Sequence, residues 1–198
     1  MIEMKPDHRF VKEWVALGVL VTLGTVGRII CDSFPNVAPV AAVALLAGFL
    51  FRSWFLAALV PILVMGISDV FIGRSEWTTQ VAVYSMLVAP VFARGYLRRR
   101  MRFAGRPWSC AVRNAWLGIP PAIVFAVSFF VVTNFACWLA WYPHTWAGLS
   151  RCYLLALPMF RGTLLGDVSF TIVLFGGYTL LRCLAASWAS RPTLEQTT

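Results

Sequence analysis

Hydrophobic residues fall in long runs along the chain, and short polar segments separate these runs. A helix needs about 20 predominantly apolar residues to cross the ~30 Å hydrocarbon layer of a bilayer. The runs predict an all-α membrane protein with six transmembrane helices, although the second and fourth runs are short for a full crossing. The six runs lie at residues 12–30, 37–51, 54–72, 79–93, 114–141 and 166–186.

The positions of the prolines and of the polar chain ends predict where the domain and its helices begin and end. We expect one six-helix domain over residues 12–189, preceded by a cytoplasmic tail at 1–11 and followed by a disordered polar tail at 190–198. A proline lacks the backbone N–H that a helix interior uses, so prolines predict helix ends or kinks. Those within the runs are Pro39, Pro61, Pro90, Pro120 and Pro121.

The composition agrees with lipid as the solvent. Of the 198 residues, 60% are hydrophobic and 13% are charged, whereas soluble domains have about 45–50% apolar and about 25% charged residues. Basic residues precede the first run, which has no convincing small-residue cleavage site. We therefore interpret this run as a retained helix and not as a cleaved signal peptide.

The net charge of +9 is distributed unevenly. Seven arginines lie in one segment, residues 94–113, between the fourth and fifth runs. A basic loop between two apolar spans is typical of a cytoplasmic loop in contact with anionic lipids, so the charge does not indicate nucleic acid. Only four of the 17 basic residues fall in segments predicted outside, which places both termini in the cytoplasm of a bacterial inner-membrane protein. These four are Arg28, Arg74, Arg151 and Arg161.

The segment at residues 142–165 is predicted as a long outer loop. It contains a mainly apolar stretch at 149–160, which is too short to span a membrane and suggests an interfacial or re-entrant helix. Such a helix either covers a pocket that faces the outside or rests on the bilayer surface.

Polar side chains within the predicted bundle gather in its outer half. Because polar groups are costly inside a membrane, this asymmetry indicates a polar cavity open to the outside. The simpler alternative is that Asp69 and Asp167 form structural ion pairs with arginines, or that Asp167 caps the last helix. The residues concerned are Arg28, Asp32, Ser68, Asp69, Gln80, Tyr84, Thr133, Asn134, Trp138 and Asp167.

The sequence offers little for catalysis. The two histidines, His8 and His144, fall in the predicted tail and loop, and no nucleophile, zinc-binding or nucleotide-binding motif is found. The cysteines form no metal-binding cluster, and only Cys31 and Cys152 fall in outer segments where a disulfide could form. We predict no enzyme, no metal site and no intrinsic cofactor. If transport is driven by ATP, that chemistry resides in another chain.

Four stretches of the sequence resemble a known family. They are FPNVAPVAA at 34–42, Ser68-Asp69 followed by Gly73, VTNFACW at 132–138 followed by YPHT, and LPMFRGTLLGD at 157–167. Together they resemble the substrate-binding S-components of energy-coupling-factor (ECF) vitamin transporters, over about residues 15–180. In length and organisation the chain is most similar to the solitary cobalamin transporters of Gram-negative bacteria.

The resemblance implies a six-helix S-component fold that binds a vitamin, best cobalamin, on its outer side. It implies membrane lipids, an ECF coupling protein and ATPases as further partners, and small residues of the first run, such as Gly18, Gly24 and Gly27, would then form the docking face. Some cobalamin transporters place a cobalt-binding cysteine near the start of the fourth span. Residues 73–90 contain none, and Gln80 lies in that neighbourhood, so thiolate ligation is not expected here.

Three functions follow as hypotheses. The first is vitamin uptake, in which amides orient the ligand and aromatic rings pack against it. The second is a membrane enzyme that acts on a lipid-linked substrate with Asp69 and Asp167 as acid and base, and the third is an assembly factor that docks through Arg98–Arg100. The predicted substrate-binding residues are Asn36, Asp69, Gln80, Tyr84, Asn134, Trp138, Tyr142, Arg161 and Asp167.

Overall fold

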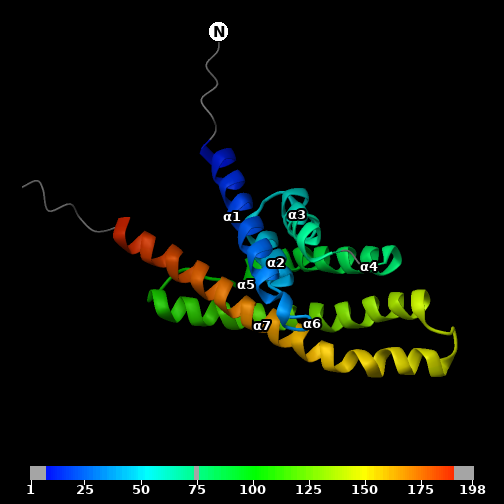
Figure 1. The fold of residues 1–198 in the computed structure, drawn as a ribbon. Helices are drawn as coiled ribbons and strands as arrows, with labels where there is room; N and C mark the ends of the chain where they lie inside the picture. The colour runs from blue at the N-terminus through cyan, green and yellow to red at the C-terminus, as the bar shows by residue number, and fades with distance from the viewer. Residues whose placement is uncertain (1–7, 74–75, 190–198) are drawn as a thin grey trace, which may run out of the picture.

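The computed structural model describes residues 8–73 and 76–189, and every regular element within them is helical (Figure 1). The first helix begins at His8, inside the predicted N-terminal tail, whereas Arg74 and the predicted tail at 190–198 lie outside the described residues. The elements are α1 (His8–Ile30), η1 (Cys31–Ser33), α2 (Val40–Leu50), α3 (Trp54–Ile72), α4 (Trp77–Val88), η2 (Ala89–Ala93), α5 (Arg94–Arg100), α6 (Pro107–Trp141) and α7 (Trp146–Ala189).

Four of these helices, α1, α3, α6 and α7, are long and apolar enough to cross a membrane. The fold is therefore all-α and fits a multi-pass membrane protein, but the prediction of six spanning helices is wrong. Helix α2 has 11 residues and α4 has 12, which correspond to about 16–18 Å at ~1.5 Å per residue. Helix α4 ends early because Pro90 cannot donate a backbone hydrogen bond, and the chain continues as the 3-10 turn η2.

The last two helices are longer than the sequence pattern suggests. Helix α6 begins at Pro107, seven residues before the predicted span, and α7 is one helix of 44 residues. The predicted outer loop at 142–165 is therefore helical from Trp146 onward, and its apolar stretch is the first part of α7. Pro120, Pro121 and Pro158 lie inside continuous helices. Figure 1 shows α6 and α7 side by side, with their joined end extending past the other helices.

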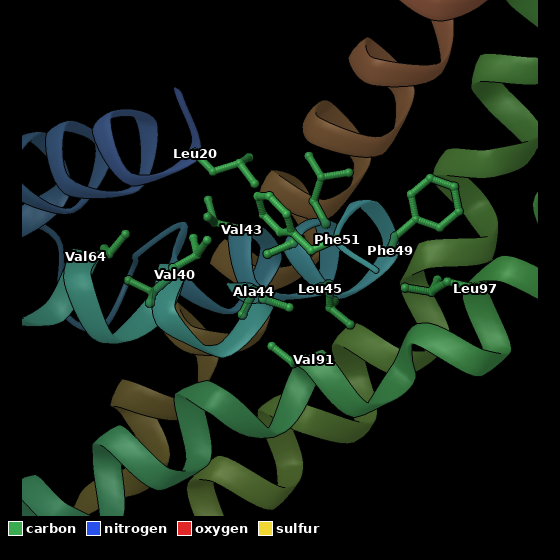
Figure 2. Close-up of a cluster of buried hydrophobic side chains, with 14 of the residues drawn as sticks. Leu20, Val40, Val43, Ala44, Leu45, Phe49, Phe51, Val64, Val91 and Leu97 are labelled. Atoms are coloured by element: carbon green, nitrogen blue, oxygen red, sulfur yellow. The ribbon is translucent and has the colours of Figure 1, made fainter. Parts of the chain in front are cut away.

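The short helix α2 lies at the centre of the bundle. It contacts all six other α-helices, and its sequence is apolar on every side, as expected of a fully buried helix. Figure 2 shows Val40, Val43 and Leu45 within this core. A Cβ added at Gly48 would lie 2.7 Å from the carbonyl oxygen of Val91, so glycine permits the close approach of α2 and η2.

Arginines of the basic segment hold the far end of α2. The last carbonyl groups of a helix have no partner within the helix, and cationic side chains complement them. Arg98 donates to the carbonyls of Phe49 (2.9 Å) and Phe51, and Arg94 donates to that of Arg52. Burial and the neighbouring charge of Arg94 lower the pKa of the Arg98 guanidinium, although arginine stays charged at neutral pH. The segment predicted as a basic loop thus contains α5 and caps a buried helix.

Candidate functional site: a cavity beside a buried carboxylate network

Asp69 is the centre of a polar network at the end of α3. Its carboxylate accepts hydrogen bonds from Arg28 (2.6 Å), Gln80 (3.2 Å) and the Tyr84 hydroxyl (2.8 Å). The Arg28 guanidinium also donates to Ser68, whose hydroxyl donates in turn to the backbone of α3. A buried charge is tolerated when a partner and hydrogen bonds satisfy it, and this network satisfies Asp69.

Three helix ends bring these side chains together. Arg28 lies in the last turn of α1 and Asp69 in the last turn of α3, which ends at Gly73 with φ 100°. Gln80 and Tyr84 lie four residues apart on α4 and therefore on one face of that helix. Glu76 fixes the start of α4 because its carboxylate accepts from the N–H of Thr78 and of Thr79.

A cavity of about 290 Å³ adjoins this network. Its wall combines polar groups with apolar and aromatic side chains, the mixture typical of sites for small molecules. The polar and charged lining residues are Arg28, Asn36, Asp69, Gln80, Tyr84, Thr163 and Asp167. The apolar part of the wall includes Met65, Val83, Leu87, Phe125 and Phe129.

Asp167 also lines the cavity, and it comes from α7, far along the sequence from Asp69. It lies in the middle of α7 and not at a helix N-terminus, so the alternative that it caps a helix is wrong. Asp167 is buried, with 6% of its surface exposed. Next to it, Gly166 and Gly162 allow the segment at 34–39 to touch α7. A Cβ added at Gly162 would lie 2.1 Å from the carbonyl oxygen of Pro35.

The two acids differ in their surroundings. Asp69 has three side-chain donors, one of them cationic, whereas Asp167 has no hydrogen-bond or ion-pair partner within residues 8–73 and 76–189. The alternative of structural ion pairs therefore describes Asp69, which pairs with Arg28, and does not describe Asp167. Chemically, the cavity offers one satisfied carboxylate and one carboxyl group that is free to bind a guest.

The structure brings five of the nine predicted binding residues to this cavity: Asn36, Asp69, Gln80, Tyr84 and Asp167. The other four lie elsewhere. Asn134 lines a smaller, adjoining cavity of about 70 Å³, which shares Asn36, Phe129 and Thr163 with the first. Its amide donates to the Phe130 carbonyl of its own helix. Trp138 and Tyr142 lie at the joined end of α6 and α7, where the Trp138 indole donates to the Pro143 carbonyl, and Arg161 is exposed on α7.

Some lining residues were not among the predicted ones. The sequence does indicate Arg28 as a candidate lining residue, because it is a cation at the end of an apolar run. Thr163 could have been found as the residue one turn before Asp167 on the same helix face. Nothing in the sequence indicates Phe125 and Phe129 as lining residues, because α6 is apolar along most of its length and the pattern does not show which face turns inward.

The cysteines and His144 lie outside the wall of this cavity. All five cysteines are free, so the disulfide considered between Cys31 and Cys152 does not form. Cys152 is buried, and its thiol contacts the Asn134 carbonyl at 3.4 Å. The His144 ring lies 3.1 Å from the Leu139 carbonyl. Within the part of the chain that the structure describes, no three histidine, cysteine or acidic residues come together as metal ligands.

Comparison with known proteins gives a family without an assigned activity. No curated protein matches the sequence, and no solved structure does either. A family described as being of unknown function (DUF6580) matches residues 8–190, which is most of the chain. The protein therefore belongs to the DUF6580 family.

Proposed function

We propose that this protein is a multi-pass inner-membrane protein that binds a small nutrient, of the vitamin class, in the cavity between Asp69 and Asp167 and takes part in its uptake. The cavity is the observation that carries the proposal. It joins hydrogen-bonding groups from the ends of α1, α3 and α4 to aromatic side chains of α6 and a carboxyl group of α7. Few purely structural interiors combine an open volume with unsatisfied polar groups.

The resemblance to ECF S-components supports the same assignment. It covers the segment at 34–42, which contributes Asn36 to the cavity, and the segment at 157–167, which contributes Thr163 and Asp167. Under this proposal the cavity faces the outside, both termini lie in the cytoplasm, and α2 and α4 complete the bundle as short helices. A coupling protein with ATPases would supply the energy in another chain.

The size of the cavity favours a compact ligand. A cavity of about 150 Å³ holds a benzene molecule, so 290 Å³ corresponds to a ligand of about two rings. Cobalamin, which the resemblance suggests, is far larger and would require the helices around the cavity to separate. We therefore propose a one- or two-ring vitamin, with cobalamin as the larger member of the test panel.

Uptake is tested by growth. A strain auxotrophic for a given vitamin and deleted for its transporter is supplied with this protein and grown on a limiting concentration of each vitamin in turn. We expect rescue for one vitamin, and loss of rescue when Phe129→Trp fills the cavity. Leu139→Trp, on an exposed face of α6, is the matched control and should rescue as well as the native protein. Absence of rescue across the panel, together with absence of binding to the purified protein, would contradict the proposal.

A second candidate is supported by one observation, namely that both acids line the same cavity. An enzyme that acts on a lipid-linked substrate could use Asp69 and Asp167 as a pair. Asp69, however, already accepts hydrogen bonds from three donors, including Arg28, so its carboxylate oxygens are occupied by protein groups and less available to a substrate. Turnover of a lipid substrate that Asp167→Asn abolishes, without loss of folding, would favour the enzyme.

A further inference from the structure

The charge of the cavity wall limits the kind of ligand that can bind there, given the proposed function, on which this inference rests. Among the described lining residues there is one cation, Arg28, and there are two acids, Asp69 and Asp167. Arg28 already pairs with Asp69, because its guanidinium donates hydrogen bonds to both Asp69 and Ser68. Among the residues that the structure describes, the wall therefore carries an acid, Asp167, that no cationic side chain balances.

Such an acid is costly without a guest. Asp167 is 94% buried, and an ionised carboxylate with so little access to water is destabilised unless a cation or hydrogen bonds replace its hydration. The neighbouring side chains on α7 do not supply hydrogen bonds that replace this hydration. Thr163, one turn earlier, donates its hydroxyl hydrogen to the Met159 carbonyl. Thr171, one turn later, makes no hydrogen bond with any described residue, and Gly166 has no side chain.

The rest of the wall suits a positively charged organic group. Phe125, Phe129 and Tyr84 line the same cavity, and aromatic rings attract cations, most strongly where water is excluded. A guest with a positively charged nitrogen and an apolar body could thus pair with Asp167 and place its body against the rings. A ligand that carries a carboxylate would be repelled by Asp167, while Arg28, the cation of the described wall, is already paired with Asp69.

We propose that the ligand of this cavity is an organic cation of at most about two rings, whose charged nitrogen pairs with Asp167. A positively charged nitrogen can come from a free solute or from the headgroup of an ethanolamine lipid. The chemistry at Asp167 is the same in both cases, and the experiment separates the two sources.

The first measurement needs no variant. Binding to the purified full-length protein is measured by calorimetry for choline and for 3,3-dimethylbutan-1-ol, which has the same shape without the charge. Thiamine serves as the two-ring cation, riboflavin as a neutral vitamin, and biotin and pantothenate as anions. We expect the cations to bind at least about tenfold more tightly than the neutral isostere and the anions, a difference of ~1.4 kcal/mol.

The second measurement assigns the charge to its residue. Asp167→Asn should weaken cation binding by about tenfold or more and should leave the ligand-free protein at least as stable as the native one, because it removes an unbalanced buried charge. Asp32→Asn is the matched control, since Asp32 is an exposed acid outside the cavity. It should change neither property. Asp167→Glu keeps the charge and should retain cation preference.

The source of the cation is resolved by competition. Displacement of bound thiamine by vesicles that contain phosphatidylethanolamine, but not by phosphatidylglycerol vesicles, would identify a lipid headgroup; failure of both to compete would identify a free solute. The inference is overturned if the neutral isostere binds as tightly as choline, or if a neutral or anionic vitamin binds while Asp167→Asn keeps full affinity. Those results would not contradict the proposed function. If no probe bound and no vitamin rescued growth, both the proposed function and the inference of a cationic ligand would be contradicted.

Discussion

At the scale of the residue, the polar side chains of this apolar chain divide into those that satisfy one another and those that do not. Asp69 and Arg28 form a pair whose side chains are 4% and 19% exposed, with Gln80 and Tyr84 as additional donors. Asp167 faces the same cavity without such a set. The network and the unpaired acid therefore give one cavity two walls of different electrostatic character.

The Arg28–Asp69 pair can be tested by a double-mutant cycle. Arg28→Met leaves Asp69 as a buried charge without its cation and should destabilise the protein by about 3 kcal/mol or more. Asp69→Asn should cost less, because Arg28 is partly exposed and keeps contact with water. The double variant should cost less than the sum of the two, with a coupling above about 1 kcal/mol. Thermal unfolding in detergent measures all three, and additive losses would contradict the pairing.

Polar residues were accessible to sequence reasoning because lipid makes them costly, so each one required an explanation. That argument gives the depth of a residue along a helix but not its direction around the helix. Asn36, Gln80 and Asp167 turn toward the cavity. Trp138 and Arg161 lie on the same helices as cavity residues but away from the cavity, and no feature of the sequence separates them from the first three.

At the scale of the element, the bundle depends on a few close approaches between backbones. Glycine permits each of them, since any side chain would occupy the space of the neighbouring chain. Gly48 meets η2 at the carbonyl of Val91, and Gly162 meets the segment before α2 at the carbonyl of Pro35. The second contact holds Asn36 near Asp167 and thereby shapes the cavity.

Gly162→Ala tests this contact. The added Cβ would lie 2.1 Å from a backbone oxygen, so α7 or the 34–39 segment must move, at a cost of about 1–3 kcal/mol. We expect a lower thermal midpoint and weaker ligand binding. Gly177→Ala is the control, because it lies on the same helix with no atom within 4 Å, and it should match or exceed native stability. Equal stability of the two variants would show that the contact is not close.

Helix boundaries were predictable where polar residues bracket an apolar run. The predicted runs at 12–30 and 54–72 agree closely with α1 and α3, since Ser53 and Gly73 bracket the latter. The lengths of α2 and α4 were not predictable as spans, because an apolar run looks the same whether lipid or protein surrounds it. Helix α7 extends further than predicted because Arg161 and Gly162, which fall in the predicted loop at 142–165, continue the helix against the 34–39 segment.

At the scale of the whole molecule, polar chemistry is split between two ends. The Asp69 network and the cavity occupy the end where α1 and α3 finish, while the arginine-rich α5 and the end of α2 meet at the other. The charge bias along the sequence predicts the second end in the cytoplasm. The joined end of α6 and α7 then belongs to the outer side.

Cysteine labelling tests this orientation. In a variant whose five native cysteines are replaced by alanine, single cysteines are introduced at the exposed positions His144 and Arg100. A maleimide that does not cross membranes should label His144→Cys in intact spheroplasts and Arg100→Cys only after lysis. Labelling in the opposite order would invert the topology and place the cavity toward the cytoplasm, which would contradict a role in uptake.

The position of α2 has a mechanical consequence. Its first residues, Val40 and Ala41, form part of the cavity wall, and the carbonyls at its other end are held by Arg98. Because the helix is a stiff rod of about 16 Å with protein on all sides, it cannot tilt at one end without displacing the other. Under the proposed function, a ligand that displaced Val40 would also displace the carbonyls that Arg98 binds, and the change would reach the arginine-rich end of the bundle.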